Sequence, residues 1–478
     1  MNKFNHFYWR AGFGPTASML RNDGAFDADT YFEAFLTASA KLPFPIRAAA
    51  NAVDGLINGI GQFGQISATP KDEMTTQRQQ RQQQSRAAIR SLNLLWLDEM
   101  VHSEAQLREK AALFWHGHFA CRNLNSFFQQ QLLQVIRDGA LGNFADLLRA
   151  VSKSPAMLAF LNNQQNRKAQ PNENFAREVM ELFTLGRGHY SETDVKEAAR
   201  AFTGWGFNAQ GEFVFRRQQH DSGTKTILGR KGNFTGDEVL DILLEQPQTA
   251  RHLATKLYRF YVNDTPDEQH VNWLAKRFFQ SGYDITALLK DILSADWMYS
   301  KANFGNRVKS PVEWWVGLRR LMPMEIENPE VQLLLQRSLG QILFYPPTVA
   351  GWSGGLAWID ASSLLLRMRM PQVLAFSETV YTSARQDDDS QMGRMQMGTG
   401  RIPNRFLLKA KIDWDAVQQT SLSTALSSLE PAALQALLPI GASTAALIKK
   451  QLQPGLPAAD RNRKSLQLLL ATPEYQLC

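Results

Sequence analysis

The chain contains 478 residues, of which 44% are hydrophobic and 20% charged, values that are ordinary for a folded globular protein. Its 31 glycines and 20 prolines exclude collagen-like and low-complexity classes, and its 2 cysteines exclude a disulfide framework. Lys and Arg number 52 against 45 Asp and Glu, and the net charge of +7 permits an anionic partner without requiring one. Basic residues are dispersed among acidic ones, so nucleic-acid binding is not expected.

No segment of the sequence predicts a membrane span. The most apolar stretch, residues 432–448, is interrupted by Gln435, Pro439 and Gly441, whereas a span needs about 20 nearly uninterrupted apolar residues. The N-terminal residues lack the basic, apolar and small-residue regions of an export signal. We therefore expect a cytoplasmic protein or, alternatively, a periplasmic one that is exported together with a signal-bearing partner.

Helical three-and-four spacing of apolar residues dominates the chain in order, over residues 92–100, 107–118, 175–183, 195–202 and 250–261. A capping box, Ser191 with Asp194, precedes the fourth of these stripes, and Gly186 and Gly188 are placed to end the helix before it. Strand-like alternation is confined to residues 212–216 and 226–228. The pattern predicts a mainly α fold, a large multi-helix globular domain with one short β-hairpin insertion.

Two polar stretches punctuate the chain. Residues 77–86 are polar on every face, which is typical of a solvated helix entry or a mobile loop. Acidic residues, Met and Gly alternate without a period toward residue 403, which favours disorder. We therefore expect a main helical domain over residues 1–380, a flexible loop over 381–403 and a small C-terminal helical unit over 404–478.

Two histidines, His116 and His118, lie among apolar residues in the stripe at 107–118. On an unbroken helix their side chains point to nearly opposite sides, so they could share a metal ion only if Gly117 loosens the helix. The alternative is a buried helix whose histidines are hydrogen-bonded core residues. His116 and His118 are the candidate metal ligands, for a divalent ion.

The predicted helix at 172–186 carries Glu178 and Glu181 on one face, three residues apart. Carboxylates at this spacing can chelate one ion or share a proton. Arg177 and Glu173 are placed to pair on the neighbouring face. An exposed face with two acids and an arginine is the ordinary alternative.

The next predicted helix carries Arg200 near its end, and a loop follows with His220, Asp221 and Lys225 within six residues of each other. A cluster of histidine, aspartate and lysine on a loop is typical of a functional site, although solvated polar residues are also common there. Gly223, Thr224 and Lys225 lack the rest of a phosphate-binding loop, so an ATPase is not expected.

Together these segments resemble the bacterial family known as domain of unknown function 1800. The resemblance rests on ordered motifs over residues 8–376: WRAGFGP at 9–15, WHGHFA at 115–120, NENFARE at 172–178, ELFTLG at 181–186, ARAFTGW at 199–205, TARHLATKLYRFYV at 249–262 and YPPTVAGW at 345–352. The family's repeated polar residues map onto Arg10, Glu109, His116, His118, Glu173, Arg177, Glu178, Glu181, Arg187, Glu192, Asp194, Glu197, Arg200, His220, Asp221 and Lys225.

The resemblance implies a context but no mechanism. Members often look exported, and their genes commonly neighbour those of the domain of unknown function 1501 family, which is similar to the alkaline phosphatase and sulfatase superfamily. A protein of that second family is therefore a predicted partner. This chain departs from the exported pattern, since no signal is visible in its N-terminal residues.

Two functions fit these residues. The first is a metal-assisted or acid–base enzyme that acts on an anionic cell-surface or polymeric substrate, with the side chains gathered in one pocket. Its catalytic residues would be Glu178, Glu181, His220 and Asp221, and Arg177, Arg200 and Lys225 would bind the substrate. The alternative is a non-catalytic helical scaffold or maturation partner of a phosphatase- or sulfatase-like protein, in which the same charges form a buried structural network.

Overall fold

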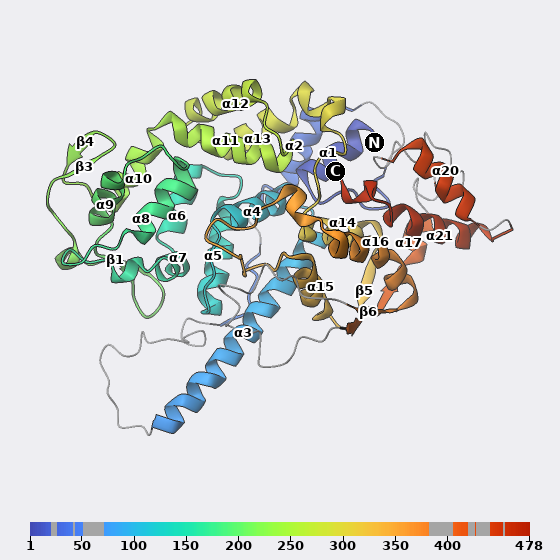
Figure 1. Cartoon of the computed structure of the whole chain (residues 1–478), viewed down its shortest axis with the longest axis horizontal. Helices are drawn as coiled ribbons and strands as arrows, with labels where there is room; N and C mark the ends of the chain where they lie inside the picture. The colour runs from blue at the N-terminus through green and yellow to red at the C-terminus, as the bar shows by residue number, and fades with distance from the viewer. Residues whose placement is uncertain are drawn as a thin grey trace.

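A computed structural model shows a mainly α protein, and it describes residues 1–20, 26–41, 44–50, 71–381, 405–418, 426, 440–452 and 455–478. The long helix α3 projects from the central helices, the segment from α8 to α10 forms one end of the molecule, and α14 to α21 form the other (Figure 1). Within the described residues no helix is both long and apolar enough to cross a membrane.

The first half of the chain supplies the central helices and one end. These elements are α1 (Lys3–Ala11), α2 (Ala28–Ala38), α3 (Lys71–His102), α4 (Gln106–His118), α5 (Ser126–Gly139), α6 (Phe144–Ser152), α7 (Pro155–Phe160), α8 (Glu173–Glu178), the π-helix η3 (Val179–Thr184), α9 (Glu192–Ala201), β1 (Trp205–Phe207), β2 (Phe213–Phe215), β3 (Lys225–Ile227), β4 (Arg230–Gly232) and α10 (Gly236–Leu244). The polar stretch at 77–86 lies inside α3, which agrees with the helix-entry interpretation and not with the loop.

The second half covers the top and the other end in Figure 1. Its elements are α11 (Pro247–Tyr261), α12 (Glu268–Gln280), α13 (Ile285–Leu293), α14 (Pro311–Leu321), β5 (Met324–Ile326), α15 (Val331–Leu339), α16 (Ala361–Phe376), β6 (Thr379–Tyr381), β7 (Arg405–Leu407), β8 (Ala410–Ile412), α17 (Trp414–Gln418), α20 (Ala442–Gln451) and α21 (Ala458–Leu470).

The strands form small antiparallel pairs. The expected hairpin lies at β1–β2, and β3 pairs with β4 in a second hairpin around residues 226–228. The sequence did not predict the pairs β5–β8 and β6–β7, because each joins strands that are far apart in the chain. Such three-residue strands carry too little alternation to be recognised without their partners.

The two ends of the described chain share one hydrophobic core, which runs from Phe7 to Cys478. Arg10 donates to the Cys478 carbonyl oxygen at 2.7 Å, and β8 pairs with β5 of the preceding part. The described residues after 404 are therefore packed against the main helical body. The boundary at 381–403 stays a prediction, since residues 382–404 lie outside those described.

Local sequence signals explain the elements around the predicted site. The Ser191–Asp194 capping box begins α9, and Gly186 and Gly188 adopt φ of +83° and +87° after the preceding helix, as predicted. The predicted helix at 172–186 is not uniform, because α8 continues into the π-helix η3. A π-helical turn inserts one extra residue and often marks a functional position.

Candidate functional site

The two histidines of α4 are buried in different aromatic surroundings. The His116 ring lies 5.1 Å from the ring centres of Trp96 and Phe344, and its Nε2 accepts a 3.2 Å hydrogen bond from the Phe344 backbone. Burial lowers the His116 pKa to about 3. His118 faces Phe119 and Phe183 instead, with ring centres 4.6 and 6.0 Å away. The helix stays regular through Gly117, so the rings diverge.

This arrangement does not fit a metal ion shared by His116 and His118. His116 Nε2 already accepts the Phe344 N–H, and the two rings belong to separate clusters. Nor does the described part of the chain contain any group of three or more His, Cys, Asp or Glu side chains that could hold a metal. We therefore derive no chemical step through a metal, and the His116–His118 metal site stays a prediction.

Glu178 and Glu181 lie at the junction of α8 and η3 and differ in their contacts. Glu181 accepts a hydrogen bond from the Tyr190 hydroxyl and lies 3.5 Å from Arg187 Nε. Among the described residues Glu178 makes no hydrogen bond or ion pair. Burial, reinforced by the Glu181 charge, raises the pKa of Glu178. Burial and the bond to Glu181 raise the pKa of Tyr190 to about 12.

Arg177 is held by two carboxylates. Its guanidinium donates to Glu173 at 3.2 Å, as the spacing predicts, and to both oxygens of Glu192 at 2.8 and 2.7 Å. These bonds tie α8 to the beginning of α9. An anionic substrate would have to displace both glutamates in order to bind Arg177.

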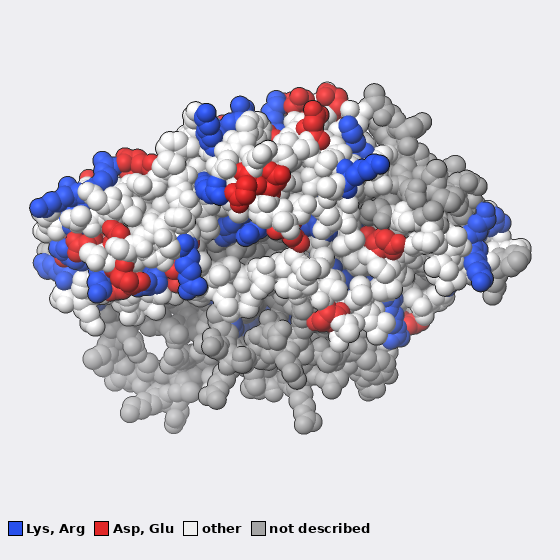
Figure 2. All heavy atoms as spheres, turned by 45° about the horizontal axis from the view of Figure 1, so that its top comes forward, with Lys and Arg blue, Asp and Glu red and all other residues white. Residues whose placement is uncertain are grey.

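Arg200 is also held by two carboxylates. Its Nε and Nη2 donate to the two oxygens of Asp221 at 2.7 and 3.2 Å, and its Nη1 contacts Glu197 at 2.9 Å. The bonds from Arg200 lower the pKa of Asp221. Acidic and basic side chains are interspersed over this end of the molecule (Figure 2). This pairing fastens the loop at 220–225 onto α9.

Lys225 and His220 also make contacts within their loop. Lys225 is buried, and its ammonium donates to the carbonyl oxygens of Asp221 at 2.5 Å and Gly223 at 3.0 Å. His220 Nδ1 lies 3.0 Å from the Thr203 carbonyl oxygen, and burial lowers its pKa. Lys225 therefore closes the loop on itself.

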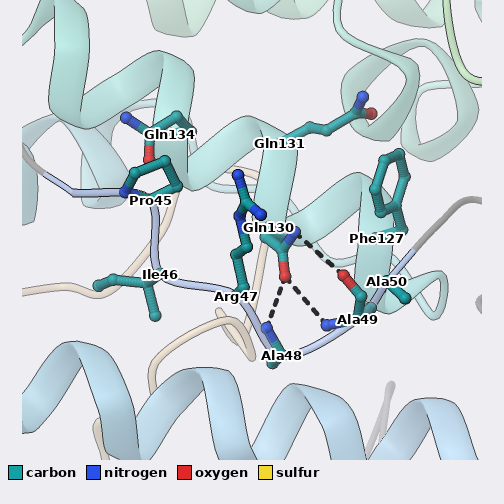
Figure 3. Close-up of a pocket in the computed structure, with 10 residues that line it drawn as sticks. All are labelled: Pro45, Ile46, Arg47, Ala48, Ala49, Ala50, Phe127, Gln130, Gln131 and Gln134. Atoms are coloured by element: carbon teal, nitrogen blue, oxygen red, sulfur yellow. Dashed lines mark hydrogen bonds between the residues drawn. The ribbon is translucent and has the colours of Figure 1, made fainter.

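The structure thus brings the predicted residues together in separate groups rather than in one demonstrated pocket. Glu178 lies with Glu181, Asp221 with Arg200 and Lys225, and each histidine of α4 in its own aromatic cluster. A cavity of about 720 Å³ lies elsewhere, between residues 45–50 and α5 (Figure 3). Gln130 fixes its wall through bonds to the Ala48 and Ala49 backbone, and no predicted site residue lines it.

Sequence reasoning missed two basic residues beside the π-helix. His252 and Lys256 lie one turn apart on α11, and His252 Nε2 lies 3.3 Å from the Leu182 carbonyl oxygen. Burial lowers the pKa of His252 to about 4 and that of Lys256 to about 8. Their four-residue spacing was visible, but the apolar stripe of the same helix offered a sufficient explanation for the pattern.

The comparisons with known proteins agree with the motif series. A family model described as "Protein of unknown function (DUF1800)" matches residues 6–477. The chain belongs to this family. No curated protein and no solved structure matched. The DUF1800 match therefore establishes membership over nearly the whole chain, while the chemistry has to be argued from the geometry.

Proposed function

We propose that the chain is an enzyme that performs general acid–base chemistry with Glu178 and Glu181. The proposal rests on the asymmetry of this pair. Glu181 is anchored by the Tyr190 hydroxyl and Arg187, whereas Glu178 has no bond among the described residues and a raised pKa. Neighbouring carboxyl groups whose environments differ in this way are a recurrent acid–base arrangement.

Each group of the pair has a distinct part in this proposal. Glu178, which retains its proton to higher pH than an ordinary carboxyl group, would donate that proton to a leaving or developing anion. Glu181, oriented by Tyr190, would accept a proton from the attacking group. The π-helical geometry places both side chains on one short segment, η3 and the residue before it. The anionic cell-surface or polymeric substrate stays a prediction.

The experiment removes the charge of each carboxylate in turn and measures the effect on activity. Purified wild type, Glu178→Gln and Glu181→Gln are assayed for cleavage of a panel of anionic cell-wall polysaccharides, with Glu268→Gln on α12 as the matched exposed control. Loss of a general acid or base costs about 10²–10⁴-fold in rate. We expect losses of that size in the first two variants and none in the control. Wild-type turnover by Glu178→Gln would contradict the proposal.

One observation favours the scaffold alternative. Arg177, Arg200 and Lys225, predicted to bind substrate, are all engaged with oxygen atoms of the protein itself. A closed network of this kind positions helices and loops without any ligand. Co-expression with a protein of the domain of unknown function 1501 family tests this alternative. A stable complex that Glu178→Gln leaves intact, without turnover by the wild type, would favour the scaffold.

A further inference from the structure

A cavity lies among α16, α17, α20 and α21, at the opposite end of the molecule from α8 to α10 (Figure 1). Its volume is about 400 Å³, and sites for small molecules usually measure about 300–1,000 Å³. Its aromatic and polar lining side chains include Phe376, Trp414, Asp460, Arg463, Lys464 and Gln467. We call this space the α21 cavity.

Two aromatic side chains border the α21 cavity. Phe376 is the last residue of α16 and is 63% exposed, while Trp414 begins α17 and is half-buried. The Arg463 guanidinium lies 5.4 Å from the centre of the Trp414 ring, a distance at which the ring attracts a cation. Exposed aromatic surface is unfavourable in water, so a ligand that covers Phe376 and Trp414 gains from its removal.

Gln467 on α21 is a buried polar side chain without a partner. Its exposed fraction is 8%, and its amide group makes no hydrogen bond with any residue that the structure describes. Buried side-chain amides in native proteins are normally hydrogen-bonded. The two amide atoms are not sealed from solvent, and the cavity that Gln467 lines gives access to them. A ligand in the cavity can therefore both donate to and accept from this amide.

The charged lining of the α21 cavity is mixed. Arg463 Nη1 lies 3.8 Å from Asp460 Oδ1, whereas Arg463 Nε is buried and has no hydrogen-bond partner in the described part of the chain. Lys464 is exposed and forms no ion pair there. The two cations and the single carboxylate leave one net positive charge at the cavity.

This combination of groups favours a saccharide that carries an acidic group. The carbon–hydrogen face of a sugar ring packs on an aromatic ring, and sugar hydroxyls both donate and accept hydrogen bonds, which suits Gln467 and Asp460. A nucleotide would also stack on Trp414, but its phosphate accepts hydrogen bonds and would be repelled by Asp460. The net positive charge favours a sugar with a carboxylate or sulfate group over a neutral one.

We propose that the α21 cavity binds an acidic saccharide, with a sugar ring against Trp414 and its acidic group beside Lys464. Glu178 lies at the other end of the molecule, so the site would hold part of a sugar chain rather than place the reacting bond (Figure 1). The assignment of this saccharide to the substrate of Glu178 and Glu181 rests on the proposed enzyme function. Saccharide binding itself does not depend on it.

Isothermal titration calorimetry of the full chain at constant ionic strength tests the proposal. The probes are hexagalacturonate, a chondroitin sulfate hexasaccharide, neutral maltohexaose and adenosine monophosphate. We expect saturable binding of at least one acidic oligosaccharide and weaker binding of maltohexaose, and the tighter of the two acidic sugars identifies the acidic group. Absence of saturable binding by both acidic sugars, or tighter binding of adenosine monophosphate, overturns the proposal.

Two variants remove the proposed contacts. Trp414→Ala should weaken binding of the acidic sugar by about tenfold, the equivalent of one lost aromatic contact. Gln467→Leu removes the amide at similar volume and should also weaken binding, so it replaces Trp414→Ala if that variant does not fold. Trp273→Ala on α12 is the matched control, because it removes another partly exposed tryptophan with an arginine 5.1 Å from its ring. Wild-type affinity in both cavity variants overturns the proposal.

Two further variants separate charge and catalysis from the rest of the site. Lys464→Gln should weaken binding of the acidic sugar severalfold and leave that of maltohexaose unchanged, because Lys464 is exposed and acts through its charge. Glu178→Gln should bind the acidic sugar like the wild type. Saccharide binding without turnover by the wild type would contradict only the acid–base proposal, and turnover without binding in the α21 cavity would contradict only this one.

Discussion

Two sites with basic residues removed from water, the Glu313 group and Lys256 on α11, differ in whether they contain a carboxylate. Around Glu313, Lys110 lies 2.5 Å away, Arg307 forms an ion pair, and the Ser310 backbone donates at 2.9 Å. These cations keep the pKa of Glu313 well below its usual range despite complete burial. Lys256 on α11 forms no ion pair or hydrogen bond with the described residues, and burial lowers its pKa instead.

The difference indicates distinct roles for the two groups. Removing a cation from water is costly, and an internal carboxylate offsets that cost within the folded protein. The Glu313 group is therefore complete, and it joins α4 to α14. Lys256 retains its desolvation cost without such an offset. The following predictions test this contrast in order of decreasing effect on stability.

The largest effect is expected at Glu313. Replacement by Gln leaves Lys110 and Arg307 buried without their counter-charge, and breaking such a pair costs about 3–5 kcal/mol. The thermal unfolding midpoint should fall steeply. Glu330→Gln, at an exposed carboxylate 4.0 Å from Arg90, is the control and should change the unfolding free energy by less than about 0.5 kcal/mol.

A smaller loss is expected for Asp221→Asn, which removes the paired bonds to Arg200 at a partly exposed position. We expect about 1 kcal/mol, reduced from a fully buried value by solvent screening. Because the folded-state pKa of Asp221 is lowered, its stabilisation is present above the ordinary carboxyl pKa and is lost as pH falls through the lowered value. Unfolding midpoints against pH should converge for wild type and variant in acid, whereas Asp146→Asn should show neither effect.

Lys256→Met should leave stability at pH 7 unchanged or increase it, the opposite of Glu313→Gln. No described carboxylate loses a partner, and the burial cost of a cation disappears. The folded-state pKa is about 8 against 10.5 for a free lysine, so the unfolded state binds more protons between these values. The wild type should therefore gain stability relative to the variant as pH rises from 8 to 10.5. A large loss at pH 7 would indicate that Lys256 has an internal anionic partner.

The smallest effect is expected for Glu178→Gln, which should change the unfolding free energy by less than about 0.5 kcal/mol. Glu178 has no bond among the described residues, so its removal breaks none of them. Equilibrium denaturation alongside the activity assay checks this. Severe destabilisation, with activity lost in proportion to folded protein, would assign Glu178 a structural role.

Much of the fold followed from local signals. The apolar stripes at 107–118, 195–202 and 250–261 became α4, α9 and α11, and the capping box and the two glycines began and ended their helices as predicted. The Glu173–Arg177 pair also formed. These features depend on residues within a few positions of each other, where spacing alone determines which side chains meet.

Other features required the tertiary structure. The partners of Arg200 and Lys225 are set by how the loop at 220–225 folds against α9, and β5 meets β8 across more than eighty residues of chain. His118 and His252 both lie beside η3 only because α4 and α11 approach the same π-helix. The sequence therefore determined where the helices form, which family the chain belongs to and which charged residues it contains. The tertiary structure decided which charges are neutralised, because that depends on contacts between segments distant in the chain and on the water excluded around them.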